Sequence, residues 1–175
     1  GFWETLQNRF VGRNMTMWQR LITEARIVIY YSSLIALPIP SRLNLDYDFP
    51  LSVSLIDPFT TFISAIAILA TGFYWVTIAR RPPLLSFAIL WFFMTQMIES
   101  TIIPLDLVYE HRLYLPSLGL IALVVVFVHK KIVRHYKAAG PVLLIIIAVP
   151  LALWTYERNE LWTDPVKLWA DNAEK

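Results

Sequence analysis

Residues 58–79 read PFTTFISAIAILATGFYWVTIA, and no charged side chain interrupts this run. A helix needs about 20 mostly apolar residues to cross the ~30 Å hydrocarbon core of a bilayer. Pro58 suits the first turn of such a helix, and Arg80 and Arg81 follow directly after the run. The stretch therefore predicts a transmembrane helix.

Four further apolar stretches flank this run on both sides. Apolar residues make up 57% of the chain, whereas soluble domains contain about 45–50%. A single helix of this kind can belong to the core of a soluble protein, but five in one chain indicate an all-α, polytopic helical membrane protein. The five predicted membrane helices cover about 20–38, 58–79, 84–103, 113–129 and 140–156.

The positive charges predict how the chain is oriented, because Lys and Arg gather in the cytoplasmic connections of membrane proteins. Ten of the 15 fall at the start of the chain or beside the turns after the second and fourth helices: Arg9, Arg13, Arg20, Arg26, Arg80, Arg81, Lys130, Lys131, Arg134 and Lys137. Residues 1–19 and both turns are therefore expected in the cytoplasm. The loops at about 39–57 and 104–112 and an amphipathic helix over 157–175 are expected outside, with the membrane domain over 20–156.

Composition also excludes several classes of function. The chain contains no cysteine, so it forms neither a disulfide nor a thiolate metal site. The net charge is only +2, and no basic run with interleaved aromatic residues is present. We therefore expect no nucleic-acid partner.

Eleven of the 13 acidic residues fall on the predicted outer side. Most such carboxylates are simply solvated, but Asp46 and Asp48 lie close enough in sequence to bind a divalent cation, which prefers carboxylate oxygens. Glu99 directly follows an apolar run. It is either an interfacial carboxylate or a group at membrane depth that needs a cavity or a partner.

The stretch DLVYEHRLYLPSLG at residues 106–119 places both signs of charge between two apolar segments. Arg112 has a permanent charge and a planar donor fork that matches phosphate. His111 adds a donor that can also carry a proton near neutral pH. Glu110 can hold either cation, and Tyr114 offers a hydroxyl. The residues predict either an anchor that snorkels to ordinary lipid phosphates or a site for a lipid-linked phosphate substrate.

Three segments together resemble the transmembrane and tetratricopeptide-repeat proteins, which include animal O-mannosyltransferases and bacterial relatives. They are LNLDYDFPLS at 43–52, YEHRLYLPSLG at 109–119 and YERNELWTDPVKLWADNAEK at 156–175. The most specific match is Glu110, Leu113, Tyr114, Pro116 and Ser117. The animal enzymes have an arginine directly after the glutamate, where this chain has His111. The order Glu-His-Arg resembles the bacterial members and leaves open which cation takes the arginine's role.

The resemblance implies a glycosyltransferase of the C-type fold in the bacterial inner membrane, or in the endoplasmic reticulum membrane of a eukaryote. Such enzymes use a polyprenyl-phosphate-linked sugar as donor and transfer the sugar to a hydroxyl on the non-cytoplasmic side, as in protein O-mannosylation. The implied lipid-phosphate site comprises Glu110, His111, Arg112 and Tyr114, with Glu99, Asp106, Asp46 and Asp48 as supporting outer-loop acids.

The resemblance also places this chain within a longer enzyme. In the family a catalytic acid lies in an early outer loop, so that acid would lie upstream of Gly1 and the chain would be the C-terminal membrane half. Residues 157–175 would lead into tetratricopeptide repeats that bind a protein acceptor or partner. The alternative is a non-catalytic scaffold or accessory subunit of a larger membrane complex.

Overall fold

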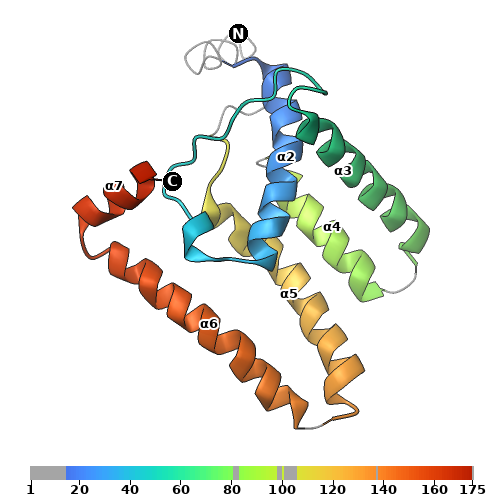
Figure 1. Cartoon of the computed structure of the whole chain (residues 1–175). Coiled ribbons are helices and arrows are strands. Elements are labelled where there is room, and N and C mark those ends of the chain that lie inside the picture. Colours follow the sequence, from blue (N-terminus) through green and yellow to red (C-terminus); the bar gives the residue numbers. More distant parts are fainter. Residues whose placement is uncertain (1–14, 81–82, 98–99, 101–105, 137, 175) are drawn as a thin grey trace.

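The computed structural model of the chain describes residues 15–80, 83–97, 100, 106–136 and 138–174. Glu99, one of the candidate site residues, lies outside this part. All regular elements in the described part are helices, which confirms the all-α fold class (Figure 1). The longer helices are α2 (Met17–Ala36), α3 (Phe59–Ile78), α4 (Pro83–Met97), α5 (Tyr114–Val128), α6 (Ala139–Leu161) and α7 (Pro165–Glu174). The short ones are η1 (Pro40–Arg42), η2 (Glu110–Leu113) and the π-helical turn η3 (His129–Val133).

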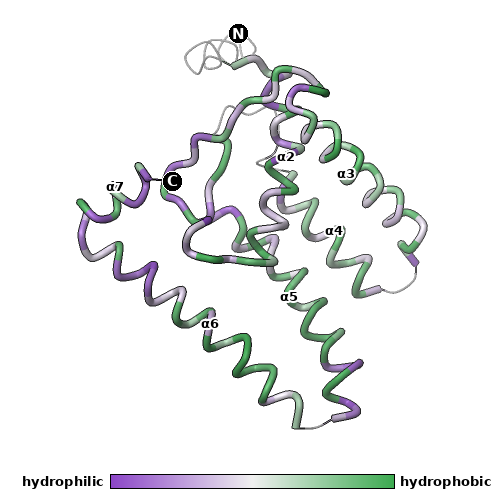
Figure 2. Tube along the Cα trace, viewed as in Figure 1, coloured by the Kyte–Doolittle hydropathy of each residue, from purple (hydrophilic) through white to green (hydrophobic). Residues whose placement is uncertain are grey.

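In the described part of the chain, three helical runs are long and apolar enough to cross a membrane. They are α3, the continuous run Glu110–Val133 that contains α5, and α6. Most of their side chains are exposed, as expected for helices that face lipid. Figure 2 shows hydrophobic residues along most of α5 and α6, with hydrophilic residues around the turn between them and near α7. The expectations for 58–79, 113–129 and 140–156 thus correspond to observed apolar helices.

The expected number of five spans is not confirmed. The third expected span, 84–103, corresponds to α4, whose 15 residues are apolar but short. The first, 20–38, corresponds to α2, which is not among the three helical runs apolar enough to cross a membrane. That helix carries three charged residues, Arg20, Glu24 and Arg26.

One face of α2 is buried along its whole length, and it mixes polar with apolar side chains. Its first residues are fixed by a capping box, in which the Thr16 hydroxyl and the Gln19 side chain satisfy each other's backbone N–H groups. One turn later the Arg20 guanidinium lies 2.9 Å from the Glu24 carboxylate, and both side chains are buried. Further along the same face, Ile27 and Tyr31 enter the main apolar core.

Residues 37–58 leave the end of α2 and run back along it towards its beginning. The Arg42 guanidinium donates to the carbonyl of Ser33 at 3.2 Å. Nearer the start of α2, Arg26 donates to the carbonyl of Pro50 at 2.8 Å. The N–H of Ser52 then donates to the Thr23 hydroxyl at 2.8 Å. Helix α3 therefore begins beside the first half of α2, and Figure 1 shows both helices starting at the same end of the molecule.

The apolar core lies between α2, this returning segment and the loop that precedes α5. Its buried residues are Ile27, Tyr31, Leu34 and Val108. The Tyr31 hydroxyl accepts a hydrogen bond from the N–H of Tyr109 at 2.9 Å and lies 3.3 Å from the carbonyl oxygen of the same residue. The core thus ties the start of α5 to the second half of α2.

The closest helix pair is α4 and α5, which pack through Trp91. The indole N–H of Trp91 donates to the carbonyl of Leu115 at 2.8 Å, which fixes the ring. Gly119 faces this ring, and a Cβ atom at that position would lie only 2.9 Å from Cδ1 of Trp91. By contrast, α5 and α6 diverge from the turn that joins them (Figure 1).

We expect Gly119→Ala to destabilise the protein by about 1–3 kcal/mol, because the added methyl group forces the fixed indole or the backbone to move. Gly72→Ala in α3 is the matched control, since nothing lies within 4 Å of its added Cβ. Thermal unfolding in detergent measures both. Equal melting temperatures for the two variants would contradict the close packing of α4 on α5.

Candidate functional site

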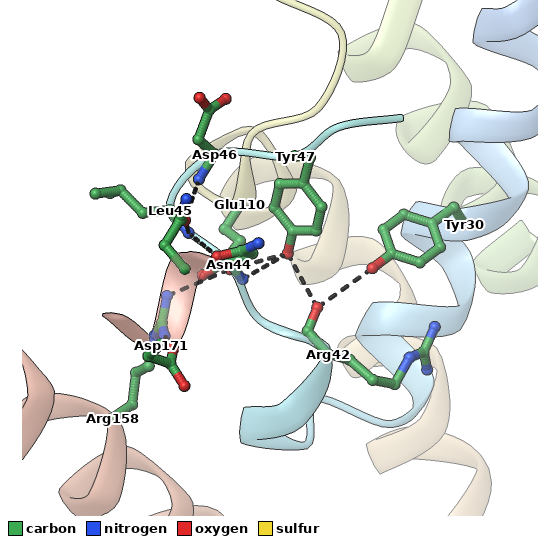
Figure 3. A network of polar contacts seen from close by, with 10 residues as sticks. Tyr30, Arg42, Asn44, Leu45, Asp46, Tyr47, Glu110, Arg158 and Asp171 are labelled. Carbon is green, nitrogen blue, oxygen red and sulfur yellow. Dashed lines mark hydrogen bonds and ion pairs between the residues drawn. The ribbon is translucent and has the colours of Figure 1, made fainter. Parts of the chain in front are cut away.

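Glu110 lies at the centre of a network that joins three distant parts of the chain (Figure 3). Its Oε1 accepts a hydrogen bond from the Tyr47 hydroxyl at 2.9 Å. The Arg158 guanidinium lies 3.9 Å from the same oxygen, which is an ion pair rather than a hydrogen bond. Arg158 also donates to Oδ2 of Asp171 at 3.1 Å. We call Tyr47, Glu110, Arg158, Asp171 and Asn172 the polar platform.

Asn172 attaches the last helix to the loop after η1. Its side-chain oxygen accepts hydrogen bonds from the N–H groups of Leu45 at 3.1 Å and Asp46 at 2.9 Å. Leu168, one turn earlier in α7, is buried. The inward side of α7 therefore carries Leu168, Asp171 and Asn172. Val166 and Trp169, by contrast, are exposed.

The Tyr47 hydroxyl is a fixed donor within the platform. It accepts from the N–H of Asn44 at 3.0 Å and lies 3.1 Å from the carbonyl oxygen of Arg42. Burial raises the pKa of Tyr47, and the negative charge of Glu110 raises this pKa further. The phenol thus stays protonated at neutral pH. Because the hydroxyl has one proton, it can donate to only one acceptor at a time, either the Glu110 carboxylate or the Arg42 carbonyl.

A second cluster gathers around Tyr109, directly before Glu110. The His111 ring stacks on the Tyr109 ring with centroids 5.1 Å apart. The Arg112 guanidinium lies over the same ring, with Cζ 5.2 Å from its centroid, and donates to the carbonyl of Asp106 at 2.7 Å. The Tyr109 hydroxyl bonds the Asp106 carboxylate at 3.0 Å, and this acceptor raises the pKa of Tyr109. Two cationic or proton-carrying groups are thus held on one aromatic ring.

The structure brings together four of the eight site residues expected from the sequence. Glu110, His111 and Arg112 are consecutive in η2, and Asp106 joins them through Tyr109 and Arg112. Tyr114 differs. It begins α5 with its side chain 77% exposed, and no hydrogen bond joins its hydroxyl to another residue of the described part.

The outer-loop acids at 46 and 48 are exposed. The backbone of Asp46 belongs to the network, but its carboxylate points away from Glu110 (Figure 3). Within the residues that the structure describes, no group of three or more His, Asp and Glu side chains is placed to hold a metal ion.

Several platform residues were not predicted from the sequence as site residues. Tyr47, Arg158, Asp171 and Asn172 all lie inside the segments that carry the family resemblance, so the segments themselves were the signal. Their pairing was not visible, because Tyr47 and Glu110 are 63 residues apart and Leu45 and Asn172 are 127 apart.

An open, mainly apolar pocket adjoins the platform between the end of α2, η1 and α6. It is lined by Pro38, Leu43, Leu151, Trp154, Thr155, Arg158 and Asn159. Arg158 thus belongs both to the wall of this pocket and to the polar platform.

Comparison with protein-family models, with curated proteins and with solved structures finds no match to this chain. The function is therefore proposed from the residues and their geometry.

We expect Arg158→Ala to loosen α7, because it leaves Glu110 and Asp171 as partly buried carboxylates without their shared cation. A lost buried pair costs about 3 kcal/mol, or roughly a hundredfold in the local opening equilibrium. Hydrogen exchange should accelerate in 165–174 and in 43–48. Lys167→Ala, an exposed charge on the same helix, is the control and should leave exchange unchanged. Equal protection of α7 in both variants would contradict the platform's role as its attachment.

Proposed function

We propose that the chain is the C-terminal membrane part of a glycosyltransferase that uses a polyprenyl-phosphate-linked sugar on the non-cytoplasmic side of the membrane. One observation carries this proposal. The three sequence segments that resemble the O-mannosyltransferase-like family meet in the polar platform, through Tyr47, Glu110 and Arg158. Segments that are far apart in sequence and converge on one site are more informative than any one motif.

In this proposal His111 and Arg112 contact the lipid phosphate. During transfer, the acceptor oxygen forms a bond to the anomeric carbon of the sugar, and the bond from that carbon to the phosphate oxygen breaks. The hydroxyl proton passes to the ionised carboxylate of the acidic residue expected upstream, which acts as the general base. Negative charge then grows on the departing phosphate, and fixed cations stabilise it.

The fixed position of Arg112 supports this reading over a simple lipid anchor. An arginine that snorkels extends a mobile side chain towards the headgroups. Here the guanidinium is held by the Asp106 carbonyl and the Tyr109 ring. His111 is the more exposed of the two cationic side chains. Glu110 then acts as a positioning residue, since Tyr47 and Arg158 hold it and with it the adjoining pair His111–Arg112.

We expect Arg112→Ala in the full-length protein to lower kcat for sugar transfer by roughly 100- to 1000-fold, as removal of one charge-stabilising donor does in other enzymes. His111→Ala should act in the same direction. Arg134→Ala, an exposed arginine just after η3, is the matched control. The assay measures transfer from a polyprenyl-phosphate sugar to a peptide hydroxyl, with vesicle binding of the free polyprenyl phosphate as a second readout.

Unchanged transfer and unchanged polyprenyl-phosphate binding in both variants would refute the phosphate role. That outcome would favour the alternative, a non-catalytic scaffold or accessory subunit of a larger membrane complex. One observation supports this second function: no residue in the most apolar 18-residue stretch of α6 is buried. Its sides are thus available to lipid or to further helices, and the repeats expected after α7 would provide a protein-binding arm.

The proposed topology has α3, α4, α5 and α6 crossing the membrane. The turns near Arg80 and Lys130 lie in the cytoplasm, and the platform lies outside. We place α2 on the outer surface rather than across the bilayer. The segment 37–58, helical only at η1, runs back along α2 from Ser33 to Thr23. Irregular backbone that faces hydrocarbon leaves costly unpaired groups. Arg20 and Arg26 have partners within the protein, so their charges do not require a cytoplasmic position.

This topology revises the expected cytoplasmic start of the first helix, and cysteine labelling tests it, because the native chain has no cysteine. We expect an impermeant maleimide added outside to label Trp18→Cys and Ser41→Cys, and to label His135→Cys only after permeabilisation. Labelling of Trp18→Cys only after permeabilisation would restore α2 as a span. Outside labelling of His135→Cys would overturn the orientation.

A further inference from the structure

A short turn directly before α3 carries an exposed apolar tip. The side chains of Val53, Leu55 and Ile56 are 63%, 44% and 69% exposed. They lie between Ser52, which is fully buried, and Pro58, which precedes the first residue of α3. Three exposed aliphatic side chains in four positions form a local apolar patch, which usually marks a contact surface rather than a solvated loop.

Four of the five N–H groups of this turn, Val53–Asp57, are hydrogen-bonded within it. The N–H groups of Val53 and Ser54 donate to the carbonyl of Asp57 at 2.9 and 3.1 Å. The Ser54 hydroxyl in turn accepts from the N–H groups of Ile56 at 3.2 Å and Asp57 at 3.1 Å. Burying a peptide group is costly only when its hydrogen bonds are lost. With most of its donors bonded, the turn can enter the headgroup layer at a lower cost than an open loop, while its carbonyl groups still reach the water of that layer.

Both ends of the turn are anchored to helices, so the tip projects from a fixed base. The Ser52 N–H donates to Thr23 of α2, and its hydroxyl shares a hydrogen bond of 2.7 Å with the Thr61 hydroxyl of α3. The Thr61 N–H donates to the carbonyl of Pro58 at 2.8 Å.

The patch continues onto a helix that is apolar enough to cross a membrane. Phe59 and Phe62 of α3 are 60% and 43% exposed, and their rings lie 5.9 Å apart. Ile63 and Ile66 extend the exposed apolar side towards the middle of the helix. Since α3 has 20 residues, about the length of the hydrocarbon core, its first residue lies near the boundary between hydrocarbon and headgroups.

We propose that the turn Val53–Asp57 inserts its apolar tip into the lipid leaflet at the beginning of α3. The partner is the bilayer itself, and two observations identify it. The tip directly precedes the apolar side of α3 in the chain, and the turn has only one N–H group, that of Leu55, left to donate to a protein partner. The Asp57 carboxylate at the rim remains exposed and faces the headgroup layer. The insertion fixes the depth of α3 and, through Thr23, holds α2 against the membrane surface.

The proposal depends on α3 crossing a membrane and is independent of any sugar transfer. Its test uses single cysteines in the full chain, each labelled with an environment-sensitive fluorophore, in vesicles of phosphatidylcholine and phosphatidylglycerol. Ile56→Cys is the test site. Ile66→Cys in α3 is the lipid-exposed reference, and Ser41→Cys in the exposed η1 is the aqueous reference. Nitroxide-bearing lipids quench a probe in the bilayer, and aqueous iodide quenches one in water.

We expect the probe at position 56 to show blue-shifted emission and quenching by lipid nitroxides placed near the headgroups, as position 66 does with deeper nitroxides. Position 41 should respond to iodide only. Quenching of position 56 by iodide alone, with position 66 in lipid, would overturn the proposal. Protection of position 56 from both quenchers would also overturn it, because it would mean that a second copy or another protein segment covers the turn.

Discussion

The need to give every buried peptide group a hydrogen-bond partner governs the arrangement of this molecule. A helix satisfies its own backbone, but the segments 37–58, apart from η1, and 106–109 are not helical. Both lie against α2, which supplies Thr23 and Tyr31 as partners for their N–H groups. Helix α2 therefore supplies hydrogen-bond partners to the backbone of two irregular segments. Its buried face is correspondingly mixed, with a charged pair near its start and Ile27 and Leu34 further along.

Glu110 has a comparable role for the candidate site. A carboxylate at the start of a membrane helix requires partners, and here they come from the loop at Tyr47 and from α6 at Arg158. These two contacts fix η2, and η2 presents His111 and Arg112 on the Tyr109 ring. Stability and site geometry therefore depend on the same few bonds. In the candidate site, Glu110 thus positions the chain, while His111 and Arg112 are directed to the Tyr109 ring.

Sequence alone predicted the apolar helices well, because a run of uncharged residues at membrane length has few alternative interpretations. Residues 58–79 became α3 at Phe59–Ile78. Residues 20–38 likewise became a helix, in which Arg20 and Glu24 pair with each other and Arg26 donates to the carbonyl of Pro50. A hydropathy scale assigns each charged residue the same cost wherever it lies. It therefore does not reveal that Arg20 and Glu24 form a buried ion pair. The site was predicted where its residues are consecutive, at Glu110 to Arg112. Its long-range partners depend on how the loop returns along α2, which no local pattern encodes.

The bond from Leu45 to Asn172 joins residues 127 apart, so the platform has a very non-local pattern of contacts. During synthesis α2 and its returning segment emerge before the other described helices, and they can pair at once. Glu110 then has Tyr47 available, but Arg158 and Asn172 are made only after two further membrane helices. Because non-local contacts form late and slowly, we expect α7 to dock after α2 has paired with its returning segment. The site thus reaches its final geometry only when the membrane helices are already in place.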